Sequence, residues 1–349
     1  MTSPCCCRSF HAYTNKTGME PLHILIISKG KIPVVKYGGV ERDIWYLGKE
    51  LTRMGHRITF LVNKGSFCDF AKVIPLDPSK ALSKQIPEDV DLVHSHIRLR
   101  EALSKPYLIT LHGNSRGHED HDLNTSFISR SHAAQYGSDV FVYNGLGLEE
   151  YGKPRWDQPR KYLHFLGKAA WKVKNLSGCI SIARSAGLPL RVLGGHRVNL
   201  KMGMRITLDP RIRFEGMVGG AQKSRLINGS KALLFPVRWP EPMGLAVVES
   251  LYFGCPVFGT PYGALPELVT EEFGYLSNRK SELVDALGHV EEYDRKKCHE
   301  YVCDNFTSAH MARNFLPLYE KVLNGKTLNQ WPPKLVPQDV PRFLPWHED

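Results

Sequence analysis

Residues 235–269 read FPVRWPEPMGLAVVESLYFGCPVFGTPYGALPELV, and they place two carboxylates, Glu241 and Glu249, eight positions apart. The apolar run at residues 232–237 is typical of a buried strand. Apolar residues then recur at helical spacing over residues 245–252, and a glycine ends the pattern. Glu241 is therefore expected in the loop before a helix, and Glu249 inside that helix.

The start of this predicted helix suits an anion. The N–H groups of Gly244, Leu245 and Ala246 have no partner within the helix and carry the positive end of its dipole. A carboxylate is a good acceptor for paired sugar hydroxyls, so one Glu on each side of a phosphate can hold two rings of one ligand. The segment therefore predicts a site for a sugar nucleotide.

The stretch EPMGLAVVE, followed by FGCPVFGT, resembles the E-x7-E signature of retaining glycosyltransferases of family 4, the glycosyl transferases group 1. The usual form of that signature is E-x-F-G-L-x-x-x-E. The resemblance implies that Glu241 contacts the transferred sugar and Glu249 the nucleotide ribose. Met243 replaces the usual Phe, and this change leaves the backbone role of the position intact. A surface helix carrying two solvated acids is the alternative interpretation of the spacing.

The first part of the chain predicts a βαβ unit. Residues 21–28 form a nearly continuous apolar run, residues 40–54 carry apolar side chains at helical spacing, and residues 58–62 begin a second strand. Gly38 and Gly39 lie at the junction before the helix, where glycines let the backbone approach a ligand closely. The segment resembles the first βαβ unit of the family, which implies that its glycine loop faces donor phosphate and acceptor. A plain tight turn is the alternative.

Two further short strands are predicted at residues 91–96 and 107–113, and the second ends on His112. The stretch ITLHG resembles a T-x-H-G segment of the family, which implies that His112 contacts the donor sugar near the reaction centre. A structural histidine is the alternative. His94 and His96 share one face of their strand, but no third metal ligand accompanies them.

The loop GHEDHD contains Asp120 and Asp122 as D-x-D, a pattern by which other glycosyltransferases hold a divalent metal. We interpret it as a solvated loop, because the retaining enzymes that this chain resembles need no metal. The expected metal-ligand set is therefore none.

A basic loop opens the second half of the chain. Lys168 follows a predicted strand and Lys174 precedes a helix that begins near Asn175, so both ammonium groups could converge. The segment resembles the G-R-x-x-x-x-x-K pattern of the family, which implies that the two cations bind the donor diphosphate and stabilise the departing nucleotide. Lys168 replaces the usual Arg and loses its bidentate fork. Lys172 could share the task, and a solvated basic loop is the alternative.

The stretch RIRFEGMV resembles the F-x-G segment of the family, which implies that Glu215, Gly216 and Met217 flank the nucleotide base. The stretch TPYGALPELV follows the second acid, and its Glu267 is interpreted as a capping or surface residue.

With 349 residues the chain exceeds one ordinary core, and alternating strands and helices predict an α/β class with parallel sheets. The resemblance implies two facing Rossmann-like domains with a cleft between them, the GT-B architecture. The expected division is a disordered extension at 1–18, an acceptor-side domain at 19–155, a nucleotide-sugar domain at 156–325 and a proline-rich tail at 326–349. The tail is expected to wrap the surface or to be disordered.

No apolar run is long enough to span a bilayer and no leader is evident, so a cytoplasmic protein is expected. The net charge of +11 could favour anionic lipid, and Arg42, Lys49 and Arg53 of the first predicted helix suggest peripheral membrane contact. The run Cys5-Cys6-Cys7 belongs to the expected extension, and an upstream extension before Met19 is its simplest explanation.

The resulting hypothesis is a metal-independent, hexosyltransferase-like retaining glycosyltransferase in cell-surface glycan or glycolipid assembly. Its donor is expected to be a nucleotide-diphosphate sugar of UDP or GDP type, with no other cofactor, and its acceptor a glycan or a lipid-linked sugar. A sugar-nucleotide epimerase, a hydrolase and a non-enzymatic sugar-nucleotide-binding protein remain alternatives. A nicotinamide oxidoreductase is disfavoured because G-x-G-x-x-G is missing after the first strand, and nucleic-acid binding because the basic residues are scattered.

Overall fold

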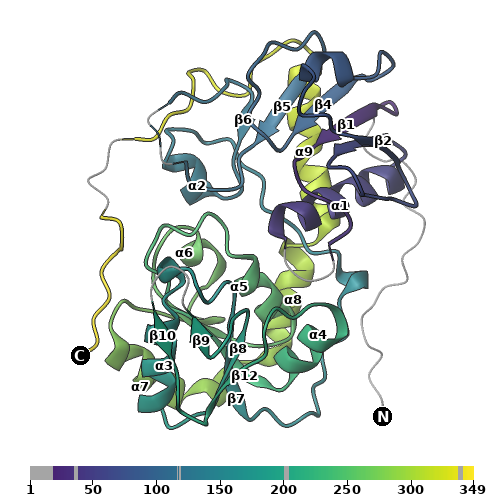
Figure 1. Ribbon diagram of the computed structural model, residues 1–349. Helices are drawn as coiled ribbons and strands as arrows, with labels where there is room; N and C mark the ends of the chain where they lie inside the picture. The colour runs from purple at the N-terminus through teal and green to yellow at the C-terminus, as the bar shows by residue number, and fades with distance from the viewer. Residues whose placement is uncertain (1–18, 35–37, 116, 118, 200–203, 337–340) are drawn as a thin grey trace.

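Two parallel α/β domains lie one above the other in this computed structural model (Figure 1). The structure describes residues 19–34, 38–115, 117, 119–199, 204–336 and 341–349. The predicted extension and its three cysteines lie outside these residues.

The first domain is built on a six-stranded sheet of order β3-β2-β1-β4-β5-β6, in which every pair is parallel. Its strands are β1 (His23–Ile27), β2 (Arg57–Val62), β3 (Lys72–Pro75), β4 (Leu92–Ser95), β5 (Tyr107–Thr110) and β6 (Thr125–Ser126). All five residues of β1 are buried. A central parallel strand covered on both faces has this continuous apolar pattern, as the sequence predicts.

The second domain has a parallel sheet of order β11-β8-β7-β12-β13-β14. Its strands are β7 (Tyr162–Leu166), β8 (Leu190–Leu193), β11 (Ile212–Phe214), β12 (Ser230–Phe235), β13 (Val257–Gly259) and β14 (Gly274–Leu276). A small antiparallel pair, β9 (Val198–Asn199) and β10 (Arg205–Ile206), stands beside it. Two doubly wound domains with parallel sheets confirm the predicted fold class.

Helices cover both sheets. They are α1 (Gly39–Arg53), α2 (Arg130–Ala134), α3 (Leu176–Ser185), α4 (Gly220–Asn228), α5 (Leu245–Tyr252), α6 (Leu265–Leu268), α7 (Lys280–Gly288), α8 (Arg295–Asn305) and α9 (Ser308–Leu323). Short 3-10 turns are η1 (Leu82–Gln85), η2 (Leu148–Glu150), η3 (Lys172–Lys174) and η4 (Val290–Glu292). No helix among the described residues combines the length and the apolar character needed to cross a bilayer.

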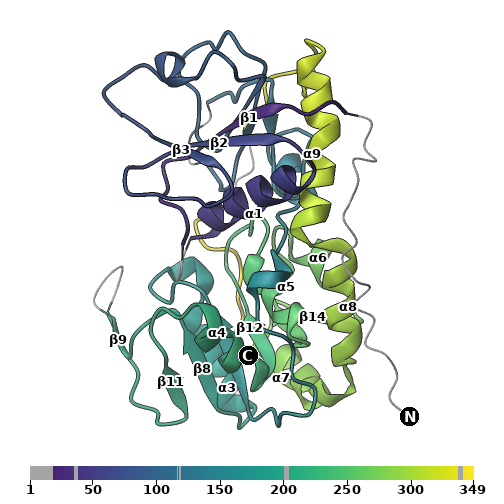
Figure 2. The same cartoon turned by 90° about the vertical axis from the view of Figure 1, so that its right-hand side faces the viewer.

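Helix α9 corrects the expected division of the chain. It lies in the range assigned to the second domain, yet it packs on the first, while α8 stays with the second (Figure 2). Its buried face carries Met311, Phe315 and Tyr319, which join the core formed by α1 and the first sheet. An apolar stripe of this size must be buried, and the first sheet offers the matching surface.

Two of the crossings between the domains, near Leu146 and near Phe306, are bonded to each other. Leu146 donates its N–H to the carbonyl of Phe306, and Ser308 donates to the carbonyl of Leu146. The backbones are so close that a Cβ added at Gly145 would lie 2.3 Å from the carbonyl oxygen of Thr307. Only glycine fits at this point.

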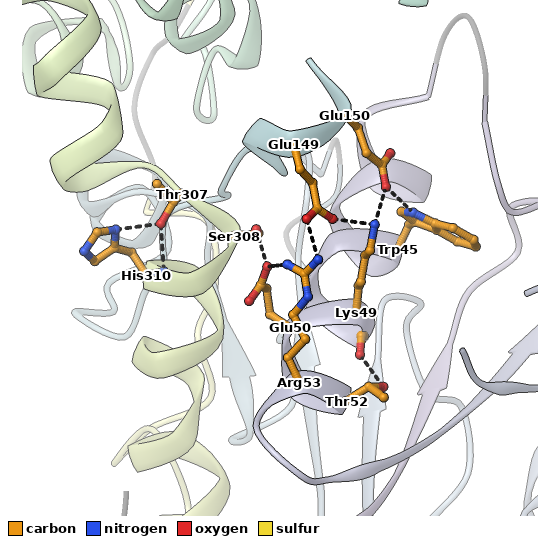
Figure 3. A network of polar contacts seen from close by, with 11 residues as sticks. Trp45, Lys49, Glu50, Thr52, Arg53, Glu149, Glu150, Thr307, Ser308 and His310 are labelled. Atoms are coloured by element: carbon orange, nitrogen blue, oxygen red, sulfur yellow. Dashed lines mark hydrogen bonds and ion pairs between the residues drawn. The ribbon is translucent and has the colours of Figure 1, made fainter. Parts of the chain in front are cut away.

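Ion pairs between α1 and η2 brace these crossings (Figure 3). Lys49 and Arg53 both pair with Glu149, and Lys49 also lies 3.1 Å from Glu150. The third cation of the expected membrane surface, Arg42, pairs with a carboxylate of the second domain. Lys49 and Arg53 are therefore paired with carboxylates within the protein, and peripheral membrane contact at α1 stays a prediction.

Candidate active site

The loops at the carboxyl edges of the two sheets meet where the domains face each other. Asn114, just beyond β5, donates its side-chain N–H to the carbonyl of Pro240, 2.7 Å away. Ser129 donates its hydroxyl to the carbonyl of Pro242 at 2.6 Å. A Cβ added at Gly39 would lie 3.7 Å from Leu245, so the start of α1 lies against the start of α5. The predicted site residues of both domains are therefore brought together.

Glu241 lies in the loop between β12 and α5, as predicted, and is 7 % exposed. Its Oε2 accepts hydrogen bonds from Lys174 Nζ at 2.6 Å and from Trp239 Nε1 at 2.7 Å. The structure thus joins the predicted sugar-binding acid directly to the predicted diphosphate-binding lysine.

Aromatic rings surround the predicted cations. Lys174 Nζ lies 5.0 Å from the ring centroid of Phe235 and 5.1 Å from that of Trp239. Lys168 Nζ lies 5.0 Å from the ring of Trp171, and the two tryptophans meet edge to face at 6.5 Å. Such rings favour a positive charge without neutralising it. Sequence reasoning overlooked both tryptophans, although each stands within three residues of a predicted site residue.

Glu249 lies inside α5, as predicted, and is 5 % exposed. Its Oε1 accepts from Arg42 at 3.1 Å and from the hydroxyl of Tyr151 at 2.6 Å. Its Oε2 accepts from Lys223 Nζ at 2.8 Å. No pattern in the sequence indicates these three partners, which come from α1, the segment after η2, and α4.

Two cations therefore face one carboxylate in this cluster. Burial by itself would raise the pKa of Glu249, but Lys223 and Arg42 outweigh it and hold the pKa below its usual range. Burial lowers the pKa of Lys223, and its attraction to Glu249 offsets only part of that shift. With Arg42 also charged, the cluster carries an excess positive charge, which suits a neighbouring phosphate.

The start of α5 has the geometry expected of an anion site. Gly244 is its N-cap, with φ of 91°, a left-handed conformation that favours glycine. Among the described residues, the N–H groups of Leu245 and Ala246 have no hydrogen-bond partner. Both Glu241 and Glu249 flank this helix start. Met243 is buried there, and its sulfur accepts the N–H of Asn144 at 3.3 Å.

His112 is held inside the first domain. Its Nε2 shares a hydrogen bond of 2.7 Å with His96 Nδ1, and its Nδ1 lies 3.6 Å from Asp43 Oδ2. Burial lowers the pKa of His112 to about 4, so the ring is neutral at pH 7. The same burial raises the pKa of Asp43 well above its usual value. Both ring nitrogens thus face protein groups, and the predicted contact with the donor sugar stays a prediction.

The rings of His94, on β4, and of His96, immediately after that strand, stack with their centroids 4.2 Å apart. Within the part of the chain that the structure describes, no three His, Cys, Asp or Glu side chains are grouped to hold a metal ion. In the D-x-D loop, Asp122 accepts from the Tyr107 hydroxyl and the Asn124 N–H. It serves as a local structural acceptor there.

The three residues predicted to flank the base lie after β11. Glu215 forms an ion pair with Arg191, and Gly216 has φ of 69°. Met217 is half-buried. A cavity of about 480 Å³ adjoins Glu215, and its lining is strongly basic: Arg191, His196, Arg197, Arg213, Phe214 and Glu215.

Glu267 caps a helix, as predicted, but across the domain boundary. From α6 it accepts the N–H groups of Arg130 and Ser131 at the start of α2, at 3.0 and 2.5 Å. The hydroxyl of Tyr143 donates to the same carboxylate at 2.6 Å. It is therefore a contact between the domains.

Residues 155–292, which carry all of these second-domain groups, match the family model described as "Glycosyl transferases group 1". This part of the chain is therefore similar to the group 1 glycosyltransferases. The match agrees with the resemblance that the E-x7-E signature and the basic loop give, and it covers the second sheet from β7 to β14. A search of curated proteins by sequence finds no match.

Solved structures show a likeness in fold that covers both domains. AviGT4, a glycosyltransferase of avilamycin A biosynthesis, matches with a TM-score of 0.70 and 18 % identity over 88 % of this chain and 99 % of its own. Sucrose-phosphate synthase from Thermosynechococcus elongatus matches with a TM-score of 0.65 and 17 % identity, over 87 % of this chain and 100 % of its own. Anabaena HepE, solved with UDP-glucose, matches with a TM-score of 0.61 and 16 % identity, over 87 % of this chain and 100 % of its own. The two-domain fold is therefore GT-B.

Proposed function

We propose that this protein is a retaining glycosyltransferase that moves a sugar from a nucleotide-diphosphate donor to an acceptor hydroxyl. The observation that carries the proposal is the bonded pair of Lys174 and Glu241 beside the unpartnered N–H groups at the start of α5. Glu249 lies in the same helix, about one turn farther on. The family match over residues 155–292 and the neighbour solved with UDP-glucose support the same reaction class.

The parts of the site correspond to the parts of the donor. We assign the diphosphate to the N–H groups of Gly244, Leu245 and Ala246, together with Lys168 and Lys174. The sugar is assigned to Glu241, with His112 nearby. The ribose is assigned to Glu249, whose Oε1 must then exchange Tyr151 or Arg42 for ribose hydroxyls. The base is assigned to the segment Glu215, Gly216 and Met217, and the glycine pair Gly38 and Gly39 faces donor and acceptor.

The reaction breaks the bond between the anomeric carbon and the diphosphate oxygen. A new bond forms between that carbon and the acceptor oxygen on the same face, so the anomeric configuration is kept. The acceptor proton goes to the departing diphosphate oxygen. Lys174 and the N–H groups of α5 stabilise the negative charge as it develops, because they are already oriented toward it. These cations supply the charge that a divalent metal supplies in other glycosyltransferases, so the proposed reaction is metal-independent.

The acceptor is assigned to the first domain and is proposed to be a glycan or a lipid-linked sugar, in a cytoplasmic protein that acts in glycan assembly. Epimerisation and hydrolysis of the donor are the competing reactions. They are distinguished by their products, because both consume the donor without an acceptor and yield epimerised or free sugar.

The first test is a calorimetric and thermal-shift screen of uridine, guanosine and adenosine diphosphates and their common sugar conjugates. A ligand that binds the native state raises its stability, so a selective rise identifies the base. Glu249→Ala should weaken that binding, and a matched Glu292→Ala at the exposed turn η4 should not. If the intact protein binds none of these nucleotides, the proposal is wrong.

A further inference from the structure

The proline-rich segment after α9 contacts both domains. Asn329 donates its side-chain N–H groups to the carbonyls of Leu123 and Thr125, both at 2.8 Å, which fixes residues 326–336 on the first domain. Residues 341–349 lie on the second domain. In Figure 1 both stretches are yellow: residues 326–336 run from the end of α9 over the top of the first domain, and residues 341–349 run along the side of the second domain away from α8. The described tail thus wraps the surface, one of the two predicted outcomes.

On the second domain, residues 341–349 are bonded like an added strand. His347 donates its N–H to the carbonyl of Asn278, and its own carbonyl accepts from Lys280, each at 2.9 Å. Tyr262 donates its hydroxyl to the carbonyl of Pro345 at 2.7 Å. This anchoring fixes the segment immediately after Leu344.

Leu344 forms two hydrogen bonds with one residue, Arg238. The N–H of Leu344 donates to the Arg238 carbonyl at 2.9 Å, and Arg238 Nε donates to the Leu344 carbonyl at 2.9 Å. The guanidinium also lies 5.5 Å from the ring centroid of Phe343. The N–H of Arg238, in turn, donates to the carbonyl of Val173 at 2.7 Å.

Arg238 and Val173 immediately precede the two residues that donate to Glu241, namely Trp239 and Lys174. A chain of hydrogen bonds therefore runs from Leu344 to Arg238 and on to Val173. It joins the loop after β7 to the loop after β12, one position away from each functional donor.

We propose that residues 341–349 are a positioning element of the donor site, with Leu344 as its positioning residue. The segment holds the two loops in register, so that Lys174 and Trp239 both reach Glu241. A displacement of about 1 Å at such a site can cost about 100-fold in rate. The effect on catalysis rests on the proposed function, but the effect on the loops does not.

The test compares four proteins: the intact chain, a deletion of residues 341–349, Leu344→Pro and Leu344→Ala. Leu344→Pro removes the N–H that Arg238 accepts, whereas Leu344→Ala keeps it and is the matched control. Hydrogen exchange over residues 171–176 and 236–243 reports on the loops without any need for activity. We expect faster hydrogen exchange in the deletion and in Leu344→Pro. In Leu344→Ala we expect the same exchange rate as in the intact chain.

In the same proteins, kcat for transfer should fall about 10-fold or more in the deletion and in Leu344→Pro, with a smaller change in the KM for the donor. A synthetic peptide of residues 341–349, PRFLPWHED, should restore both exchange protection and kcat to the deletion, and a scrambled peptide should not. Restoration in trans separates positioning from a general loss of folding.

Unchanged exchange in both the deletion and Leu344→Pro would overturn the positioning role. Faster exchange with an unchanged kcat would also overturn it, because the loops would then not need the segment for catalysis. If the intact chain transfers no sugar and binds no nucleoside diphosphate, while exchange still rises in the deletion, the proposed function fails and the loop contact stands.

Discussion

Arg42 of the first domain donates to Glu249 of the second at 3.1 Å, so the second acid of the E-x7-E signature also bonds the two domains. Glu249→Gln should lower the free energy of unfolding by about 3–5 kcal/mol, because Lys223 and Arg42 are then buried without a carboxylate. Arg42→Gln should lower the free energy of unfolding clearly less, because it leaves Lys223 paired with Glu249. Urea unfolding at pH 7 measures both, and equal losses would contradict the two-cation arrangement.

The same carboxylate gives a dependence on pH. The folded pKa of Glu249 lies below its usual value of 4.5. Its pairing therefore stabilises the protein above about pH 4.5, and this contribution is lost as the pH falls through the folded pKa. Below pH 4.5 the free energy of unfolding should accordingly fall less steeply with falling pH in Glu249→Gln than in the wild type. Parallel curves would show that the pairing does not depress this pKa.

Lys174 and Lys172 lie on the same 3-10 turn, but only Lys174 is bonded to Glu241. If Lys174 stabilises the departing diphosphate, Lys174→Met should reduce kcat by about 100- to 1,000-fold. Lys172→Met removes an exposed charge from the same turn. It should change kcat less than about 3-fold, because solvent and salt screen an exposed charge. Steady-state kinetics with a saturating donor distinguish the two, and a similar loss in both variants would reassign the task to the loop as a whole.

Gly263 is a site glycine that the sequence did not reveal. It has φ of 64°, and a Cβ there would lie 2.2 Å from the N and 2.3 Å from the O of Glu241. Gly263→Ala should therefore displace Glu241 and reduce transfer about 100-fold. Gly288→Ala is the control, because a Cβ added there meets no atom within 4 Å. Normal transfer by Gly263→Ala would show that the loop tolerates the displacement.

Much of the fold follows from local patterns in the sequence. The buried run of β1 and the helical spacing of α1 and α5 appear in the structure within two residues of the predicted bounds. Strands β3 and β6 were not predicted. The first is partly exposed at every position and the second is two residues long, so neither has a continuous apolar pattern.

The sequence indicates candidate site residues, but it does not indicate their partners. Glu241 and Lys174 stand in recognisable motifs, so the sequence indicates them. Arg42 and Lys223 reach Glu249 from positions 207 and 26 residues away in the chain. Neither has a local pattern, and only the packing of α1 and α4 around α5 brings them together. The docking of α9 on the first domain was missed for the same reason.

His164 provides a test of the core of the second domain. It is fully buried on β7 between the hydroxyls of Ser230 and Ser250, at 2.7 and 2.9 Å. Burial lowers the pKa of His164 from 6.5 to about 3. The unfolded chain therefore takes up a proton below pH 6.5 that the folded protein refuses until about pH 3. The folded state should lose about 1.4 kcal/mol of stability for each pH unit in that window, from this residue alone.

His164→Gln keeps a hydrogen-bonding side chain that does not titrate. The variant should be less stable than the wild type at pH 7, because the buried contacts are imperfect, but its stability should fall less steeply between pH 6.5 and pH 4. The slope should differ by about one bound proton, that is, by about 1.4 kcal/mol per pH unit. Urea titrations at pH 4.5, 5.5 and 6.5 measure this slope. Equal slopes in both proteins would mean that His164 already binds its proton in the folded state, and that its two serine contacts must accept a charged ring.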